Sequence, residues 1–168
     1  FPCRVFELTA EGWMELHLRL GAHGIHEILR LANLPESTAF AGDFRPGQRV
    51  EIHESYRHWL RGWASEWTSG STVTIDYGDT LPALYHRRTA GTIRGYANHQ
   101  RLTGLEIYQA PGRLDLTADV NFSDLQKWGE DLGWRTTRHG TLDEVLGKVT
   151  GPHFLEAAKA FRVLEQSK

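Results

Sequence analysis

Cysteine is almost absent from this sequence, in which Cys3 is the only one among 168 residues. One thiol excludes an internal disulfide and a cysteine-rich zinc site, and this usage is typical of a reducing compartment. Long apolar runs are missing as well, because none approaches the roughly 20 residues of a membrane-spanning helix. The start of the chain shows no basic-then-apolar leader. We therefore expect no membrane insertion and a location in the cytosol or an organelle matrix.

An excess of charge of one sign is also lacking. The 19 Lys and Arg residues face 21 Asp and Glu residues, so the formal net charge is -2. So small a charge gives no general attraction to nucleic acid or to an anionic membrane, and we expect neither as a partner. His23 and His26 have the spacing of metal ligands but no third ligand nearby, so we expect no metal site. A hydrophobic content of 40% and the length suit one globular domain.

Alternating apolar residues dominate the start of the chain. Residues 4–8 and 13–20 alternate on either side of a turn that contains Gly12, which predicts a β-hairpin. The pattern between residues 21 and 49 is irregular. Residues 25–34 fit a short helix or a strand, and we expect the rest as a long loop or insertion.

An amphipathic helix is predicted next, beginning at Glu54 or Ser55 and ending at Ser69 and Gly70. Its apolar residues recur at helical spacing, and we interpret its tryptophans as core residues: Tyr56, Trp59, Leu60, Trp63 and Trp67. Residues 72–75 then predict a buried strand that ends in the polar residues 76–79. A helix, a turn and a buried strand form one step of a parallel sheet, and ligands gather at the carboxyl ends of such strands.

The last third of the chain alternates between helical and extended patterns. Ser123 is a candidate N-cap for a helix, and residues 134–138 predict a strand. Thr141 begins a sequence with capping-box spacing. Residues 154–164 fit either one helix or a helix that runs into a strand, and periodicity does not separate the two.

Three ordered segments carry a resemblance to a known family. They are residues 75–78 (Ile-Asp-Tyr-Gly), residues 91–96 (Gly-Thr-Ile-Arg-Gly-Tyr) with His99, and Pro111 and Gly112 followed by residues 115–120 (Asp-Leu-Thr-Ala-Asp-Val) and Phe122. With this spacing and the opening hairpin, the sequence resembles the MidA family of class I S-adenosylmethionine (SAM)-dependent methyltransferases over nearly the whole chain. That family includes the mitochondrial arginine methyltransferase that assists the assembly of respiratory complex I.

The resemblance implies an α/β fold, namely the C-terminal half of a Rossmann-like class I methyltransferase sheet with an added β-hairpin and long insertions. The chain would form a single partial domain, with the hairpin and an insertion in residues 1–50 and the C-terminal part of the sheet in residues 51–168. Residues 72–75 would be the fifth strand of the sheet, residues 134–138 the sixth and residues 161–164 the antiparallel seventh. The resemblance thus favours a strand at the C-terminus.

The implied cofactor is SAM, in the full-length protein. The glycine-rich turn after the first strand, the acidic residue after the second and the Asn-Glu segment after the fourth belong to the N-terminal half of the family, and none is present here. Such a turn lets the backbone approach the ligand, and the acidic side chain binds ribose hydroxyls. The chain also starts at Phe1 instead of Met. We therefore expect a truncated protein that lacks its cofactor-binding residues and is inactive by itself.

The resemblance also bears on substrate and location. The mitochondrial member is known for symmetric dimethylation of an arginine in a complex I subunit. This implies a protein substrate, with arginine as the acceptor and a respiratory complex I subunit as a candidate. It also implies the bacterial cytoplasm or, in a eukaryote, the mitochondrial matrix. Two alternatives stay open: a non-catalytic protein-binding module, and a non-functional fragment that exposes a sheet edge.

Three acidic residues are candidates for catalysis and substrate positioning: Asp76, Asp115 and Asp119. Asp76 ends a predicted strand, and its carboxylate could accept two parallel hydrogen bonds from a substrate guanidinium. The alternative is a turn-forming Asp that binds nearby backbone amides. Asp115, Thr117 and Asp119 alternate along an extended segment, so their side chains would share one face and suit a cation. The alternative is an exposed polar face of a strand.

Further substrate-binding candidates follow from the matched motifs. Tyr77 and Tyr96 could form a pocket wall beside Gly78 and stack on a guanidinium, or they could be half-buried core aromatics. His99 could act as a base near pH 7, or it could have a structural role. We interpret residues 87–88, two arginines, as a solvated loop.

Overall fold

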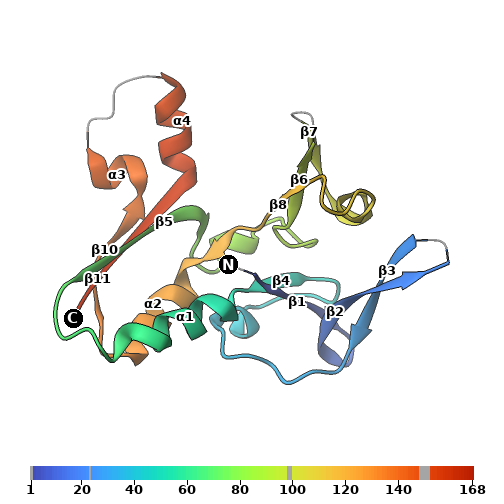
Figure 1. Cartoon of the computed structure of the whole chain (residues 1–168), viewed down its shortest axis with the longest axis horizontal. Coiled ribbons are helices and arrows are strands. Elements are labelled where there is room, and N and C mark those ends of the chain that lie inside the picture. The colour runs from blue at the N-terminus through green and yellow to red at the C-terminus, as the bar shows by residue number, and fades with distance from the viewer. Residues whose placement is uncertain (1, 23, 98–99, 148–151) are drawn as a thin grey trace.

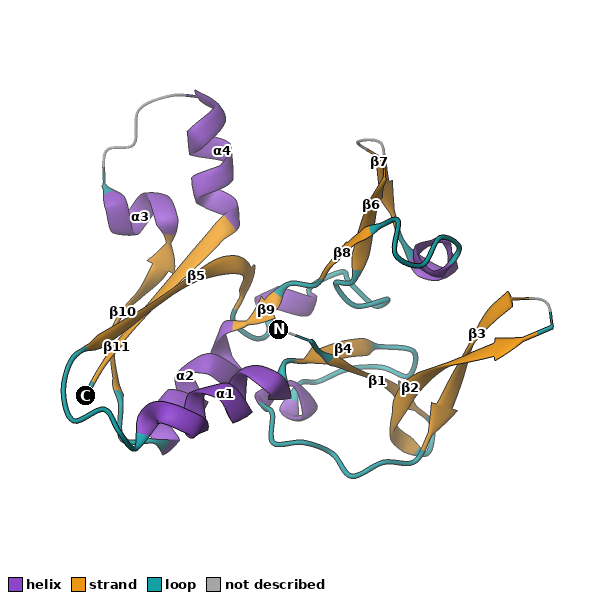
Figure 2. Ribbon diagram, viewed as in Figure 1, coloured by secondary structure: helices purple, strands orange, loops and turns teal. Residues whose placement is uncertain are grey.

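The computed structural model describes residues 2–22, 24–97, 100–147 and 152–168, and His23 and His99 lie outside them. These residues form a mixed α/β fold with three sheets, and Figure 1 and Figure 2 show the elements arranged along the chain. No helix within these ranges has the length and apolar character needed to cross a membrane.

The first sheet contains the predicted hairpin. Strand β1 (Arg4–Thr9) pairs with β2 (Gly12–Gly21), β2 continues into β3 (Gly24–Arg30), and β4 (Arg49–Ile52) closes the order β3-β2-β1-β4. All of these pairs are antiparallel. The segment that fits either a helix or a strand is therefore a strand, because its backbone pairs residue by residue with β2 from Gly21 to Glu15.

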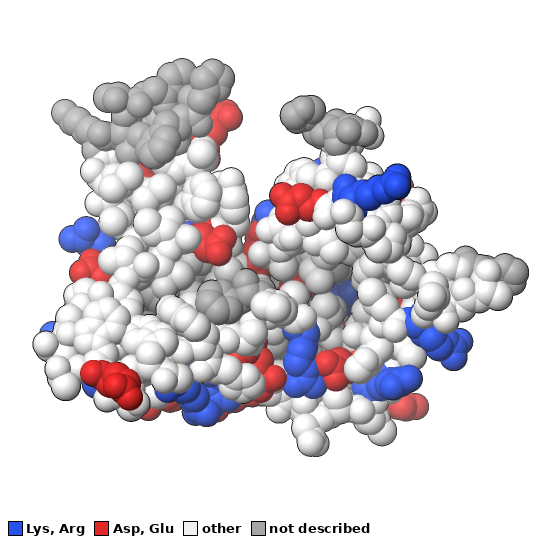
Figure 3. All heavy atoms as spheres, viewed as in Figure 1, with Lys and Arg blue, Asp and Glu red and all other residues white. Residues whose placement is uncertain are grey.

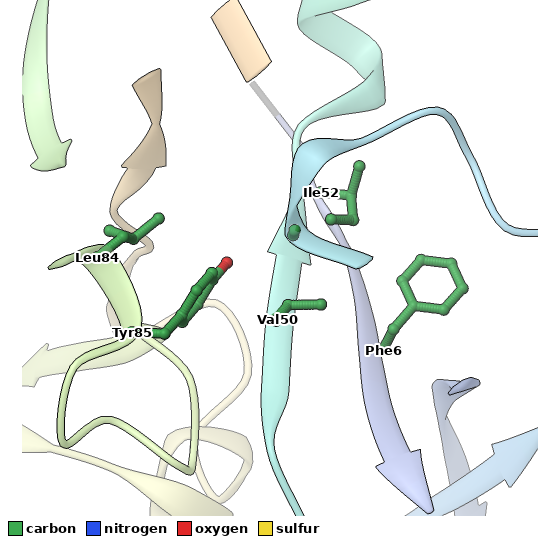
Figure 4. Close-up of a cluster of buried hydrophobic side chains, with 6 residues drawn as sticks. Phe6, Val50, Ile52, Leu84 and Tyr85 are labelled. Carbon is green, nitrogen blue, oxygen red and sulfur yellow. The ribbon is translucent and has the colours of Figure 1, made fainter. Parts of the chain in front are cut away.

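The predicted long loop between β3 and β4 contributes to the first hydrophobic core. A short 3-10 helix, η1 (Thr38–Ala41), brings Ala39 against the sheet, and η2 (Ala83–Tyr85) brings two more residues from the other side. The cluster is shown in Figure 4 and comprises Phe6, Ala39, Val50, Ile52, Leu84 and Tyr85, all at most 3% exposed. The loop is thus anchored by apolar burial, although its sequence shows no periodicity.

The second sheet combines segments that are distant in the sequence. Its order is β10 (Arg135–Thr141), β11 (Phe161–Ser167), β5 (Ser71–Asp79) and β9 (Val120–Asn121). Strand β11 is antiparallel to both β10 and β5. Helix α4 (Pro152–Ala160) runs directly into β11, so the C-terminus does end as an antiparallel strand.

Helices α1 (Glu54–Ala64) and α2 (Phe122–Asp131) cover one face of this second sheet (Figure 2). The core between them comprises Leu60, Phe122, Leu125, Trp128 and Leu164. The N-cap of α2 is Asn121, two residues before the predicted Ser123, and its side chain accepts a hydrogen bond from the backbone N–H of Ser123. The predicted capping box is present at the start of α3 (Leu142–Leu146).

Strand β5 differs from the prediction of a short buried strand. It is nine residues long, and Val73 and Ile75 are 59% and 49% exposed. Side chains alternate between the two faces of a strand. Thr74 therefore faces α1, where its Oγ1 lies 3.2 Å from the Tyr56 hydroxyl, whereas Val73 and Ile75 point to the opposite face, which the described residues leave open.

The parallel α/β step is also only partly present. Strand β5 has one parallel partner among the described residues, the two-residue strand β9, and its long partner β11 is antiparallel. The architecture is therefore a mixed α/β fold with several sheets, and a Rossmann-like half-sheet stays a prediction.

The aromatic stripe of α1 lies closer to the surface than predicted. The helix ends at Ala64, so Trp67 lies beyond it, and Trp59 is 49% exposed. The rings still form a continuous row from Trp59 through Trp63 to Trp67, with neighbouring centroids 5.2 and 5.0 Å apart. The interpretation of these tryptophans as core residues is therefore wrong for Trp59. Trp59 is exposed because it lies on a side of α1 that the sheet does not cover.

A small third sheet completes the fold. Its order is β7 (Gln100–Leu102), β6 (Arg94–Ala97) and β8 (Asp115–Thr117), all antiparallel, with the 3-10 helix η3 (Gly104–Tyr108) in the connection. This sheet and the α3–α4 region form two projections on the same side of the molecule (Figure 1). The carboxyl end of β5 lies at their base.

Candidate functional site

Two cavities flank the carboxyl end of β5, and consecutive residues line different ones. Thr74 and Asp76 line the first cavity, whereas Tyr77, Gly78 and Asp79 line the second. The segment that leads into β9 divides in the same way, because Thr117, Ala118 and Val120 line the first cavity and Asp119 lines the second. We call them the Asp76 cavity and the basic cavity.

The Asp76 cavity has a volume of about 390 Å³ and walls of mixed polarity. Ile93 and Leu116 supply apolar surface, and Thr117 and Asp76 supply polar groups. Such a combination of apolar walls and a few polar groups is typical of a site that binds a side chain or a small ligand.

Asp76 lies within strand β5 and not in a turn, and its proposed role toward a substrate stays a prediction. Its Oδ1 accepts a hydrogen bond of 2.7 Å from the backbone N–H of Tyr77, as expected for an Asp that binds a nearby backbone amide. Its Oδ2 has no hydrogen-bond or ion-pair partner among the described residues, and the side chain is exposed to the cavity. One carboxylate oxygen is therefore available to a cation that enters.

His53 and Cys3 also line the Asp76 cavity, and neither was identified from the sequence. Burial lowers the pKa of His53 to about 4. Burial and the nearby charge of Glu51 raise the pKa of Cys3 to about 11. Both side chains are therefore neutral near pH 7, and Cys3 has no thiolate character that would make it a nucleophile. The one sequence signal for His53 was its position immediately before the start of a helix.

Asp119 lies in the basic cavity, and its charge is already paired. Its Oδ1 accepts a hydrogen bond of 2.6 Å from Arg94 Nη1, and its Oδ2 accepts one from Arg88 Nη1. It is 7% exposed. Arg87 and Arg88 lie in an exposed loop, as predicted, and the ion pair with Asp119 holds the half-exposed Arg88 side chain close to β6. Asp119 orients two arginines of this chain, so it offers little free charge to a substrate cation.

A buried carboxylate, that of Glu51, holds the backbone around Asp119 in place. Its oxygens accept hydrogen bonds from Thr92 N, Thr92 Oγ1 and Ile93 N at 2.8 to 3.4 Å. The Thr92 hydroxyl in turn accepts one from the backbone N–H of Asp119 at 2.9 Å. Burial raises the pKa of Glu51 above its usual value.

This approach of Glu51 explains the first glycine of the Gly-Thr-Ile-Arg-Gly-Tyr motif. A Cβ at Gly91 would lie 2.1 Å from Glu51 Oε1, and the backbone there has a φ of +80°. Only glycine fits both constraints. The motif therefore has a structural role, because it holds the backbone at Asp119 and Arg94 in position.

The predicted cluster of Asp115, Thr117 and Asp119 does not form. Strand β8 ends at Thr117, so the alternation stops before Asp119. Asp115 is exposed and lines neither cavity, Thr117 lines the Asp76 cavity and Asp119 lines the basic cavity. Within the described ranges, no three His, Cys, Asp or Glu side chains come close enough to hold a metal ion.

The predicted tyrosines and Gly78 do lie together, in the basic cavity. Tyr77 stacks on Phe161, its neighbour on β11, with ring centroids 4.0 Å apart. The Tyr96 hydroxyl accepts a hydrogen bond of 3.0 Å from Arg94 Nε. A Cβ at Gly78 would lie 2.1 Å from the carbonyl oxygen of Val120, so glycine allows β9 to approach β5. Their ligand role stays a prediction, and that of His99 falls outside the described residues.

Comparison with known families gives one match over most of the chain. Residues 1–140 fit the family described as "Putative S-adenosyl-L-methionine-dependent methyltransferase". The chain belongs to this family. The resemblance inferred from the ordered motifs is therefore confirmed, and SAM is the cofactor on which the family depends.

Two curated relatives are arginine methyltransferases. The chain is 26% identical over 134 residues to the human mitochondrial protein arginine methyltransferase NDUFAF7. The aligned region covers 77% of this chain and 28% of the relative. The chain is also 26% identical over 132 residues to the Xenopus tropicalis protein of the same name, and that alignment covers 75% and 28%. The chain thus spans less than a third of the length of these relatives.

Two crystal structures of Burkholderia thailandensis proteins have a similar fold. One, bound to S-adenosyl-homocysteine, matches with a TM-score of 0.76 at 22% identity. The match covers 100% of this chain and 50% of the chain in that crystal structure. The other matches with a TM-score of 0.74 at 23% identity, over 99% and 52%. The methyltransferase-like fold thus extends over the whole chain, which spans about half of each solved structure.

The described residues do not fit a SAM site of the family type. Such a site needs a glycine-rich turn between a strand and a helix, where backbone amides approach the ligand. The junction of β4 and α1 is His53, and that of β9 and α2 is formed by Asn121 and Phe122, without glycine. At the junction of β10 and α3, the side chains of Thr141 and Glu144 already cap the helix.

Proposed function

We propose that this chain is the substrate-facing part of a SAM-dependent protein methyltransferase that acts on arginine. The observation that carries the proposal is the Asp76 cavity, with a free carboxylate oxygen at the carboxyl end of β5. The match to the SAM-dependent family and the similarity to two arginine methyltransferases support it. They also disfavour a binding module unrelated to methyl transfer.

The residues of the cavity suit an arginine side chain. The aliphatic stem would lie against Ile93 and Leu116, and the guanidinium would donate to Asp76 Oδ2. Thr117 would fix the rotation of the guanidinium plane through its hydroxyl. The contribution of this chain is alignment of the acceptor nitrogen, which is the main requirement of a displacement reaction.

We further propose that SAM is held by polypeptide outside the described residues, and that the described part does not catalyse methyl transfer by itself. The lack of a glycine-rich strand-to-helix turn supports this. So does the open face of β5, where Val73 and Ile75 are half exposed. A respiratory complex I subunit as substrate, and the bacterial cytoplasm or the mitochondrial matrix as location, belong to the same proposal and rest on the family resemblance.

The test is methyl transfer by the product of the complete gene. We expect transfer from SAM to arginine in a protein substrate, detected by mass spectrometry, and binding of SAM measured by calorimetry. Asp76→Asn should lower kcat/KM by about tenfold or more while SAM affinity stays unchanged, because the lost charge–guanidinium bond is about 1.5–3 kcal/mol.

Asp43→Asn is the matched control, because Asp43 is exposed and lines neither cavity. It should leave kcat/KM unchanged. Absence of SAM binding by the complete gene product would contradict the whole proposal, and equal effects of the two variants would contradict the role of Asp76.

A further inference from the structure

The basic cavity gathers positive charge that the chain as a whole lacks. It has a volume of about 400 Å³ and is lined by five basic and two acidic side chains, an excess of three positive charges. The whole chain carries a formal net charge of -2. The basic residues come from the loop before β6 and from β6, β7, α4 and β11, so the fold brings them together: Arg88, Arg94, Arg101, Lys159 and Arg162.

Three of the five cations are ion-paired within the chain, with two carboxylates between them. Asp119 pairs with Arg88 and Arg94, and Asp79 accepts a hydrogen bond of 2.8 Å from Arg162. Arg101 and Lys159 have no ion-pair or hydrogen-bond partner among the described residues. They stand on β7 and α4, on the two projections that flank the cavity. Of the excess of three positive charges, one remains where Asp119 is shared by two arginines, and two are supplied by Arg101 and Lys159 on opposite walls.

The tyrosines add hydrogen-bond donors to the same cavity. Tyr96 accepts from Arg94 through its hydroxyl oxygen, so its own proton is free to be donated. The Tyr77 hydroxyl has no partner among the described residues, and stacking on Phe161 fixes its ring. Cations on two walls with hydroxyl donors between them are complementary to a carboxylate.

We propose that the basic cavity binds an acidic side chain of the protein substrate, in addition to the arginine that enters the Asp76 cavity. This inference rests on the proposed function and adds the substrate class. The two cavities lie on opposite sides of β5, because the consecutive residues Asp76 and Tyr77 point to opposite faces of the strand. The preferred substrate therefore carries an Asp or Glu besides the arginine, and the two side chains approach β5 from opposite faces.

A protein segment fits this cavity better than a nucleic acid. Binding of a polynucleotide needs basic residues along an extended track of phosphates. Here the excess charge is confined to one cavity of side-chain size. Acidic and basic side chains are intermingled over the visible face of the molecule (Figure 3). The Asp79 and Asp119 carboxylates would also repel a second negative group at the cavity base.

The test measures binding of a fluorescently labelled hexaglutamate peptide by anisotropy, with hexaglutamine as the uncharged peptide, to the product of the complete gene. The double variant Arg101→Glu/Lys159→Glu should raise the Kd for hexaglutamate by about tenfold or more, and Arg101→Gln/Lys159→Gln by less. The Kd should also rise between about 50 mM and about 300 mM salt. Arg45→Glu is the control, because Arg45 is exposed and lines neither cavity.

Equal binding of hexaglutamate by the double variant and by Arg45→Glu would overturn the proposal, provided that both melt like the parent protein. Tighter binding of a uridine hexanucleotide at the same cavity would overturn it in favour of nucleic acid. Displacement of the peptide by inorganic phosphate at lower concentration than by free hexaglutamate would overturn it in favour of a free anion. The assay needs no SAM, so its outcome is separable from failure of methyl transfer.

Discussion

Individual buried groups determine the shape of the Asp76 cavity. His53 lines this cavity at the junction of β4 and α1, and it is 8% exposed. Because burial disfavours the imidazolium, the folded protein holds this side chain neutral at pH values where an unfolded chain would begin to protonate it. Glu51 has the opposite tendency, because its pKa is raised. The two groups make the stability of this region sensitive to pH.

His53 should make the protein less stable in mild acid. Its folded pKa of about 4 lies below the usual value of 6.5, so its contribution is fully present above pH 6.5 and is lost as the pH falls toward 4. We expect a loss of up to about 3 kcal/mol from this group. The measurement is urea unfolding of the parent and of His53→Gln between pH 7 and pH 4, since their difference removes the opposing effect of Glu51.

His58→Gln serves as the comparison, because His58 is on the same helix with a side chain that is 68% exposed. It should retain the pH dependence of the parent. If His53→Gln also retained it in full, burial of His53 would not be its cause.

At the scale of elements, an acidic side chain of α2 links this helix to the loop that packs on the first sheet. Asp124 on α2 is 2% exposed and accepts hydrogen bonds from Ser37 Oγ, Thr38 N and Thr38 Oγ1 at 2.6 to 2.7 Å. These donors belong to the start of η1, which packs on the first sheet. Burial raises the pKa of Asp124. Its loss would therefore uncouple the loop core from the helix.

Asp124→Asn should destabilise the protein by about 2–3 kcal/mol, because an amide group cannot accept from all three donors and buries unsatisfied polar groups. Asp131→Asn, on the exposed end of the same helix, loses a surface ion pair with Lys127 and should cost at most about 0.5 kcal/mol. Chemical unfolding measures both. Similar values for the two variants would show that the contact between η1 and α2 contributes little.

Some features at the scale of elements could be predicted from the sequence and others could not, for physical reasons. The hairpin and the capping box depend on neighbouring residues, and both could be predicted. The contact of Asp124 with Thr38 joins residues 86 apart in the sequence, and no local pattern encodes it. The same limit applies to the site. The motif around Asp76 identified a segment that lines both cavities, although β5 ends at Asp79 and not at Ile75. The pairing of Asp119 with Arg88 and the positions of His53 and Lys159 in the cavities depend on tertiary packing.

The whole molecule has an open face on its second sheet. Val73 and Ile75 expose apolar side chains on β5, and the edge of this strand that faces away from β11 has no strand partner from Ser71 to Tyr77 among the described residues. Unpaired apolar edges promote association. On the proposed function, this face is covered in the product of the complete gene.

Substitution of this face tests that cover. In the product of the complete gene, Ile75→Lys should lower the free energy of unfolding by about 2 kcal/mol or more, because it would bury an unpaired charge. Leu105→Lys, at a residue of η3 that is 59% exposed, should change it by about 0.5 kcal/mol or less. Denaturant unfolding provides the measurement. A harmless Ile75→Lys would show that solvent reaches this face in the intact protein.

The alternation of cavity linings along β5 constrains how the length of this segment can vary among homologues. Seven consecutive residues of β5 are held in register with β11. Loss or gain of one residue before Asp76 would present the carboxylate to the opposite side of the sheet and exchange it with an aromatic ring. Insertions or deletions tolerated in this segment should therefore occur in pairs, and single-residue events should be compensated by a bulge nearby.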